Sequence, residues 1–192
     1  ITYTDFTKED NWPGLIKENT KMIWLETPSN PLLKLVDIKK IKNEITKDNI
    51  KIVCDNTFAS PYNQQPLILG ADVVLHSSTK YLGGHSDVIG GALIIKDDNS
   101  LAEKIKYLQN AVGSVPSPFD CYMLIRSIKT LAVRMEKHNS NAKIISQFLN
   151  THDKVTNVRY PGLITDPNHE IAKLQMSGFG GIISIELNKF SK

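Results

Sequence analysis

Short apolar runs alternate with helical patterns along the first half of the chain, and this alternation restricts the fold more than any other feature. The runs are rich in β-branched residues and bounded by turn-forming residues, as buried parallel strands are. The sequence predicts strands at residues 22–25, 52–54, 72–75 and 92–95. Strands that alternate with helices predict a doubly wound α/β sheet.

Helical periodicity separates these strands. Residues 37–47 place Ile38, Ile41 and Ile45 on one stripe with lysine and glutamate on the opposite side, and residues 101–109 repeat this pattern. A single apolar stripe is typical of a helix that packs on a sheet.

The pattern changes after Gly113. A loop containing several prolines is followed by a long, nearly uninterrupted helix at residues 118–149, which indicates a crossing between domains. Two further strands, at residues 155–158 and 182–187, flank a short helix near residues 169–176. These last elements predict the start of a smaller α+β domain.

Composition and charge exclude several classes of protein. Lysine and arginine are spread along the 192-residue chain, so the formal net charge of +3 does not indicate a nucleic-acid partner. No run approaches the roughly 18 apolar residues that a membrane-spanning helix needs. The two cysteines lie far apart, which favours a reducing, cytoplasmic compartment over a disulfide scaffold or a zinc site. Because the chain begins without methionine, we also expect it to be a segment of a longer protein.

Polar residues follow three of the predicted strands, where the sequence reads ETPSNP, DNTF and HSSTKYLGGHSD. Ligands of open α/β sheets bind beyond the carboxyl ends of the strands, so these segments are the candidates for a site. ETPSNP is explained equally well as a proline-rich turn in which Ser29 or Asn30 bonds the local backbone. Gly83 and Gly84 predict a close turn after Lys80.

Lys80, Asp55, Ser77 and Thr79 together match the needs of one cofactor. Pyridoxal phosphate needs an amine for its aldehyde, hydroxyls for its phosphate and an anion against its ring nitrogen. Ser77 and Thr79 are two residues apart, so in an extended or turning segment both hydroxyls can face one phosphate while the lysine points elsewhere. A solvated lysine and a structural salt bridge at Asp55 are the alternative interpretations.

The string GADVVLHSSTKYLGGHSDVIGG, with DNTFASPYNQQPL and ETPSNP before it, resembles the Cys/Met-metabolism family of pyridoxal-phosphate enzymes. The resemblance extends over essentially all 192 residues, and the later strings GSVPSPFDCYMLIRSIKTLAVRMEKH, YPGL and HEIAKLQMSGFGG are most similar to the eukaryotic cystathionine γ-lyase branch. It implies fold type I of the pyridoxal-phosphate-dependent transferases, which is like that of aspartate aminotransferase. Residues 1–130 would then belong to the large cofactor-binding domain, and residues 131–192 to a connecting helix and an incomplete small domain.

The resemblance also implies roles for individual residues. Lys80 would bind the cofactor as a Schiff base and then act as the base that removes the substrate's α-proton. Asp55 would pair with the ring nitrogen, and the Thr57 hydroxyl would lie close to the ring face. Both Lys80 and Asp55 are therefore the implied catalytic residues.

Four more residues match cofactor-binding positions of the family. Ser77 and Thr79 match phosphate ligands, Asn30 matches an amide that bonds the phenolic oxygen, and Glu26 matches a carboxylate of the site. No metal is implied. His76, His85 and His138 are interpreted as structural, because a histidine in a turn more often makes a hydrogen bond than catalyses a reaction.

The implied activity is γ-elimination of L-cystathionine to L-cysteine, 2-oxobutanoate and ammonia, in a cytoplasmic homotetramer whose sites are shared between subunits. Cystathionine γ-synthase, cystathionine β-lyase and methionine γ-lyase remain alternatives, as does a scaffold subunit that keeps the fold without activity. The family's N-terminal and C-terminal segments are absent from this sequence, so we expect the chain alone to be inactive. A dinucleotide-binding dehydrogenase would need a GxGxxG turn, and the sequence has none.

Overall fold

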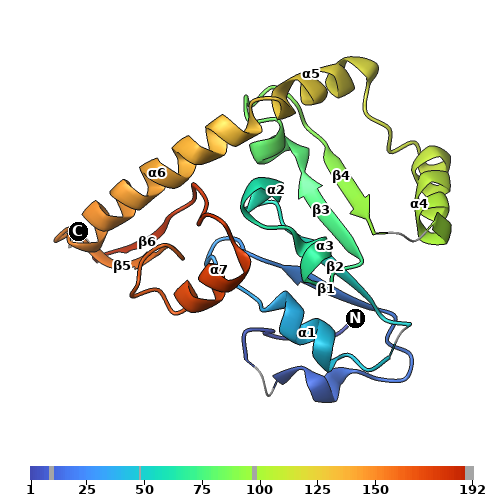
Figure 1. Ribbon diagram of the computed structural model, residues 1–192, viewed down its shortest axis with the longest axis horizontal. Coiled ribbons are helices and arrows are strands. Elements are labelled where there is room, and N and C mark those ends of the chain that lie inside the picture. The colour runs from blue at the N-terminus through green and yellow to red at the C-terminus, as the bar shows by residue number, and fades with distance from the viewer. Residues whose placement is uncertain (9–10, 48, 97–98, 189–192) are drawn as a thin grey trace.

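Four strands form the main sheet of the computed structural model, which describes residues 1–8, 11–47, 49–96 and 99–188. The strands follow one another in the order β1 (Met22–Glu26), β2 (Lys51–Asp55), β3 (Val73–Ser77) and β4 (Gly91–Ile95) (Figure 1). β1, β2 and β3 are parallel. This confirms the predicted α/β class with a mostly parallel sheet.

β4 corrects one prediction, because it runs antiparallel to β3, with Val73 opposite Ile95 and Ser77 opposite Gly91. A parallel neighbour needs a crossover connection, usually a helix that covers the sheet. The connection at residues 78–90 contains only a short helical turn, Ser78–Leu82, so the chain folds directly back. The strand is also partly exposed, not buried as predicted.

One face of the sheet carries the main core. Ile23 and Leu25 of β1 are buried there, whereas Met22 and Trp24 point to the other face and are 55% and 54% exposed. Helix α1 (Ile38–Glu44) adds its apolar stripe to this core. It is shorter than the predicted helix at residues 37–47, because Asp37 caps it and Ile45 is already extended.

Short helices connect the strands of the main sheet. A turn at Pro13–Leu15 precedes β1, and α2 (Ser60–Asn63) and α3 (Pro66–Leu69) lie between β2 and β3. Each of the three carries proline in its first two positions, where the missing N–H costs no hydrogen bond. Helix α4 (Asn99–Val112) follows β4 and contains the predicted helix at residues 101–109.

Two helices replace the single long one predicted at residues 118–149: α5 (Pro118–Ile128) and α6 (Leu131–Asn150). The Thr130 hydroxyl donates to the Ser127 carbonyl at 2.9 Å, a local bond that competes with a continuous helix. Helix α6 then runs from the main sheet to the second one, as Figure 1 shows.

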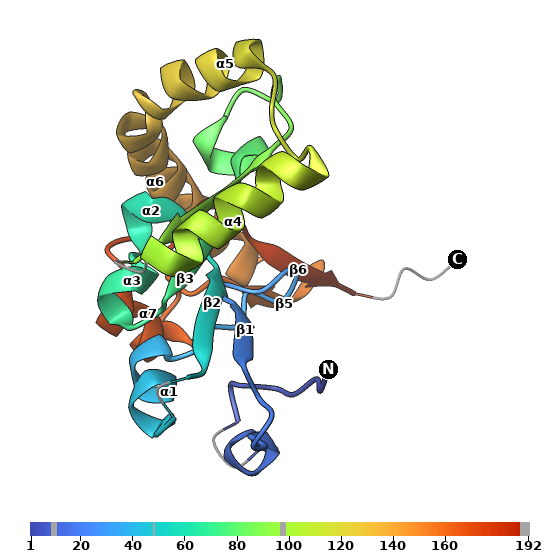
Figure 2. The ribbon, with the colours of Figure 1, turned by 90° about the vertical axis from the view of Figure 1, so that its right-hand side faces the viewer.

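The second sheet has two antiparallel strands, β5 (Val155–Arg159) and β6 (Ser184–Leu187), with α7 (His169–Gln175) between them in sequence. Figure 1 shows this sheet at the far end of α6, and in the turned view of Figure 2 it lies behind the main sheet. These elements confirm the predicted start of an α+β unit, while the domain boundary at residue 130 stays a prediction. Among the described residues, no helix is both long and apolar enough to cross a membrane.

Candidate functional site

Three strands end side by side at one edge of the main sheet. Glu26 is the last residue of β1 and lies opposite Asp55, the last residue of β2. Asp55 in turn lies opposite Leu75, two residues before β3 ends at Ser77. Parallel strands bring their carboxyl ends to the same edge, so the polar segments marked in the sequence meet there.

The Asp55 carboxylate is held by hydrogen bonds to its own turn. Its Oδ1 accepts from the Thr57 backbone N–H at 3.0 Å and from the Thr57 hydroxyl at 2.6 Å. No ion pair of Asp55 occurs within the part of the chain that the structure describes. The salt-bridge alternative therefore gains no support, and one carboxylate oxygen remains able to accept from a ligand.

Thr57 joins the ends of β2 and β3. While its hydroxyl donates to Asp55, its Oγ1 accepts from the Ser77 backbone N–H at 2.9 Å. A hydroxyl can do both at once, because it has one donor and two acceptor positions. The orientation of Asp55 and the end of β3 are therefore fixed by one side chain.

His76 lies buried beside this pair of strand ends and is only 3% exposed. Burial lowers the pKa of the His76 imidazole, and the Asp55 charge acts on it in the opposite direction to a smaller extent. The strand period of two could have indicated its burial, since it places His76 on the same side as Val74, which is also buried.

The Lys80 turn, defined here as residues 77–84, carries the candidate anchor. Gly83 N–H donates to the Ser78 carbonyl at 2.8 Å, and Gly84 N–H to the Lys80 carbonyl at 2.7 Å. Between these bonds Lys80 leaves helical geometry, with φ −91° and ψ −125°. Its side chain is exposed, and within the described ranges its amine has no hydrogen-bond or ion-pair partner.

Thr79 lies in a turning segment, one of the two backbone forms that its prediction allowed. It belongs to the helical turn Ser78–Leu82, and its Oγ1 accepts from the Gly90 N–H at 3.1 Å. The chain starts to turn directly after Ser77, so the two residues span the change from strand to turn. A shared phosphate role for the two hydroxyls stays a prediction.

The proline turn, defined as residues 28–33, follows β1 at the same sheet edge. Glu26 Oε1 accepts from the Asn30 backbone N–H at 3.2 Å, and Ser29 Oγ accepts from the Lys34 N–H at 3.1 Å. The local-turn alternative is thus confirmed for Ser29. Glu26 and Asn30 are both exposed, which leaves their side chains accessible to a ligand.

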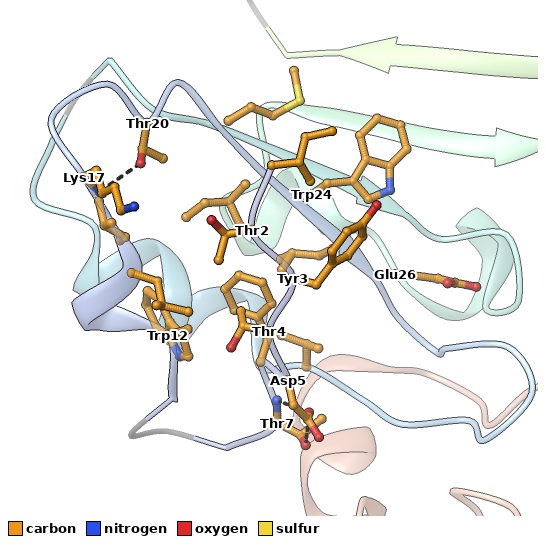
Figure 3. Close-up of a pocket in the computed structure, with 18 of the residues that line it drawn as sticks. Thr2, Tyr3, Thr4, Asp5, Thr7, Trp12, Lys17, Thr20, Trp24 and Glu26 are labelled. Atoms are coloured by element: carbon orange, nitrogen blue, oxygen red, sulfur yellow. Dashed lines mark hydrogen bonds between the residues drawn. The ribbon is translucent and has the colours of Figure 1, made fainter.

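A separate groove of about 1160 Å³ lies between the N-terminal segment and β1. Figure 3 shows Tyr3, Trp24 and Glu26 among the residues that line it. Glu26 belongs both to this groove and to the strand-end site, whereas Lys80 and Asp55 do not line the groove. The candidate site is therefore built on the strand ends, next to this groove.

The donor set at the strand ends fits pyridoxal phosphate chemically. The Lys80 amine matches an aldehyde, and the accepting oxygen of Asp55 matches a protonated ring nitrogen. The hydroxyl of Ser77 and the turn that follows it offer donors of the kind that phosphate needs.

Two residues that the sequence patterns did not mark, Arg134 and Gly181, contact the Lys80 turn at Tyr81. The Tyr81 hydroxyl accepts from the Gly181 N–H at 3.0 Å, and Arg134 Nη1 donates to the Tyr81 carbonyl at 2.7 Å. These partners are separated by 100 and 53 positions in the chain. No local pattern reports such contacts, so only the position of Tyr81 directly after Lys80 could have drawn attention to it.

Comparison with known proteins supports the same cofactor. The model of the Cys/Met metabolism PLP-dependent enzyme family matches residues 1–192. A cystathionine beta-lyase of Coxiella burnetii is 53% identical over 187 residues, which cover 97% of this chain and 48% of that protein. A probable cystathionine gamma-synthase of Herpetosiphon aurantiacus is 57% identical over 185 residues, which cover 96% and 58%.

Solved structures give the same result for the fold. Cystathionine gamma-lyase from Lactobacillus plantarum, complexed with L-serine, superposes with a TM-score of 0.93 at 48% identity. The match covers 97% of this chain and 49% of that one. The chain thus spans about half the length of the relatives that it matches.

Proposed function

The chain belongs to the Cys/Met metabolism PLP-dependent enzyme family, and from this premise we propose that it forms the cofactor-binding centre of a carbon–sulfur lyase that acts on L-cystathionine. The proposed reaction is γ-elimination, in which water and cystathionine give cysteine, 2-oxobutanoate and ammonia. The observation that carries this proposal is the meeting of the ends of β2 and β3, where the Thr57 side chain joins Asp55 to Ser77, three residues before Lys80.

Lys80 would anchor the cofactor. Its amine has no protein partner among the described residues, so it is available to bond to an aldehyde carbon. When bound, the cofactor supplies the electron sink that makes the loss of a proton next to the amino group feasible. Once the substrate amine has displaced it, the Lys80 Nζ would be the base that receives that proton.

Asp55 and Thr57 would orient the ring. The Thr57 hydroxyl and N–H fix one oxygen of Asp55, which leaves the other to hold the proton on the ring nitrogen. A carboxylate that is already oriented loses little freedom when the ligand arrives. Ser77 and Thr79 would bind the phosphate, and Asn30 and Glu26 would contact the cofactor or substrate from the proline-turn side.

Cystathionine γ-synthase is the second candidate, because relatives bearing that name are 54% to 57% identical to this chain. Cystathionine β-lyase has comparable support at 53%. A homotetramer in the cytoplasm that processes small sulfur amino acids completes the proposal. The exposed apolar face of β1, with Met22 and Trp24, supports burial of this face against further protein.

Product analysis separates these reactions. The longest natural chain that carries this sequence is loaded with cofactor and given cystathionine, or cysteine plus an activated homoserine. We expect cysteine and 2-oxobutanoate from cystathionine, and no product from Lys80→Ala. Homocysteine and pyruvate would instead show a β-lyase, and formation of cystathionine a γ-synthase. A cofactor-loaded protein that turns over neither substrate would overturn the proposal.

A further inference from the structure

We propose that Arg134 of α6 is a positioning residue for the candidate anchor, because its guanidinium fixes the backbone of the Lys80 turn against the α5–α6 junction. This inference rests on the proposed role of Lys80. It concerns a residue that lies outside the strand-end site and contacts it through the main chain.

The Arg134 guanidinium donates hydrogen bonds to three different groups. Nη1 donates to the Tyr81 carbonyl at 2.7 Å, Nη2 to the Ser127 carbonyl at 3.2 Å, and Nε to the Thr130 hydroxyl at 3.0 Å. Tyr81 directly follows Lys80, whereas Ser127 lies at the end of α5 and Thr130 directly precedes α6. One rigid, planar group therefore links the Lys80 turn to a helix end, which a lysine could not do with a single ammonium.

Gly84 provides the space for this guanidinium. It has a positive φ of +66°, and a Cβ atom added to it would lie 2.0 Å from Arg134 Nη1. The guanidinium thus packs directly against the backbone at the end of the Lys80 turn. Any side chain at Gly84 would displace it.

The contacts of Arg134 are those of a backbone clamp and not of an ion pair. No carboxylate pairs with it in the described ranges, and all its bonds go to carbonyl or hydroxyl oxygens. Burial lowers the pKa of the guanidinium, which is consistent with partial removal of the charge from water. The three hydrogen bonds offset the cost of that desolvation.

Apolar packing supports the turn from the same helix. Leu82 packs with Leu131 and Met135 of α6, which lie three residues before Arg134 and directly after it. Without the guanidinium, Leu82 would still be packed, but the Tyr81 carbonyl would lose its donor. The peptide group between Tyr81 and Leu82, one residue beyond the non-helical backbone of Lys80, would then lose its constraint.

We expect replacement of Arg134 to misorient Lys80 without preventing it from binding the cofactor. A displacement of about 1 Å at a reacting group can reduce a rate about a hundredfold. Replacement of Arg134 should therefore lower kcat while Lys80 still reaches the cofactor. The substrate does not contact Arg134 in this scheme, so KM should change little.

The test compares Arg134→Met, Arg134→Lys and Lys137→Met in the longest natural chain, loaded with cofactor. Lys137 is the matched control, because it is an exposed cation one turn along α6 with no side-chain partner among the described residues. Each variant is measured for kcat, KM, the pH at which the absorption of the bound cofactor changes, and the fraction of Lys80 trapped by borohydride.

We expect Arg134→Met to retain trapping at Lys80, to lose roughly 10- to 100-fold in kcat with KM within about threefold, and to shift the absorption transition. Arg134→Lys should fall between this variant and wild type, and Lys137→Met should match wild type. If Arg134→Met does not fold, Arg134→Lys carries the test.

The role of Arg134 would be overturned if Arg134→Met or Arg134→Lys had the same kcat and the same absorption transition as the control Lys137→Met. That result would leave the proposed function intact. Absence of label on Lys80 in the wild-type protein would overturn the proposed function itself.

Discussion

The Lys80 turn and the proline turn lie at the same edge of the sheet, but different parts of the chain hold them. All hydrogen bonds found for the proline turn in the described residues join partners within residues 26–34. The Lys80 turn is bonded instead by Thr57, Arg134 and Gly181. One side of the site is therefore encoded locally, whereas the anchor side depends on remote segments.

The largest loss of stability should come from replacing Gly84, whose backbone packs against the Arg134 guanidinium. Gly84→Ala should lower the free energy of unfolding by about 2 to 4 kcal/mol, since it adds both a left-handed backbone penalty and displacement of the guanidinium. Gly113→Ala is the matched control, because Gly113 also has a positive φ but has no atom within 4 Å of an added Cβ. It should cost only about 1 to 2 kcal/mol. Urea unfolding measures the free energy of unfolding of both variants. Equal losses in the two variants would show that the Arg134 guanidinium does not constrain the backbone at Gly84.

Removal of the Thr57 hydroxyl should have the next largest effect. Thr57→Val leaves the Ser77 N–H without its acceptor and Asp55 without its shortest hydrogen bond, which should cost about 1 to 3 kcal/mol in unfolding free energy. Thr165→Val, at an exposed loop position, should change it by less than about 0.5 kcal/mol. Retention of cofactor during gel filtration should fall only in the Thr57 variant. Unchanged stability at both positions would argue that Thr57 does not link the strand ends.

Acidification should weaken the anchor side of the site through His76. Its pKa in the folded protein lies below the ordinary value of 6.5, so below that pH the unfolded chain binds more protons than the folded one. The free energy of unfolding should therefore decrease as the pH falls through about 6.5, by at most about 1.4 kcal/mol per pH unit. Unfolding measured between pH 8 and pH 5 should show this slope in wild type and a flatter one in His76→Gln. Identical slopes would mean that another group titrates.

The smallest effect is expected in the proline turn. Ser29→Ala removes the acceptor of the Lys34 N–H and should cost about 0.5 to 1.5 kcal/mol. Because the bond is local, hydrogen exchange in the Lys80 turn should stay unchanged. Faster exchange at Tyr81 or Gly84 would show that the two turns are coupled after all.

Much of the main sheet could be predicted from the sequence, because apolar runs and the polar residues after them are local signals. Parallel pairing then brings Glu26, Asp55 and Ser77 to one edge without further information. The direction of β4 could not be predicted, since an apolar run does not indicate which way a strand runs. The break at Thr130 was also missed, because helix-forming residues continue on both sides of it.

The residues of the candidate site also divide into those that the sequence identifies and those that only the structure reveals. Lys80 and Asp55 stand out in the sequence by residue type and position, and the family resemblance adds Thr57, which the structure places in contact with Asp55. Arg134 does not stand out, because its contact with Tyr81 joins residues 53 positions apart. What holds an anchor in place is therefore harder to predict than the anchor itself.

The most direct test of the account is borohydride reduction of the cofactor-loaded protein, followed by peptide mass mapping. The reduction converts a bond between cofactor and lysine into a stable pyridoxyl-lysine. We predict a single label on Lys80, with Lys80→Ala unlabelled. Label on another lysine, or none in a protein that retains the cofactor, would contradict the proposal that the strand-end site is the cofactor centre.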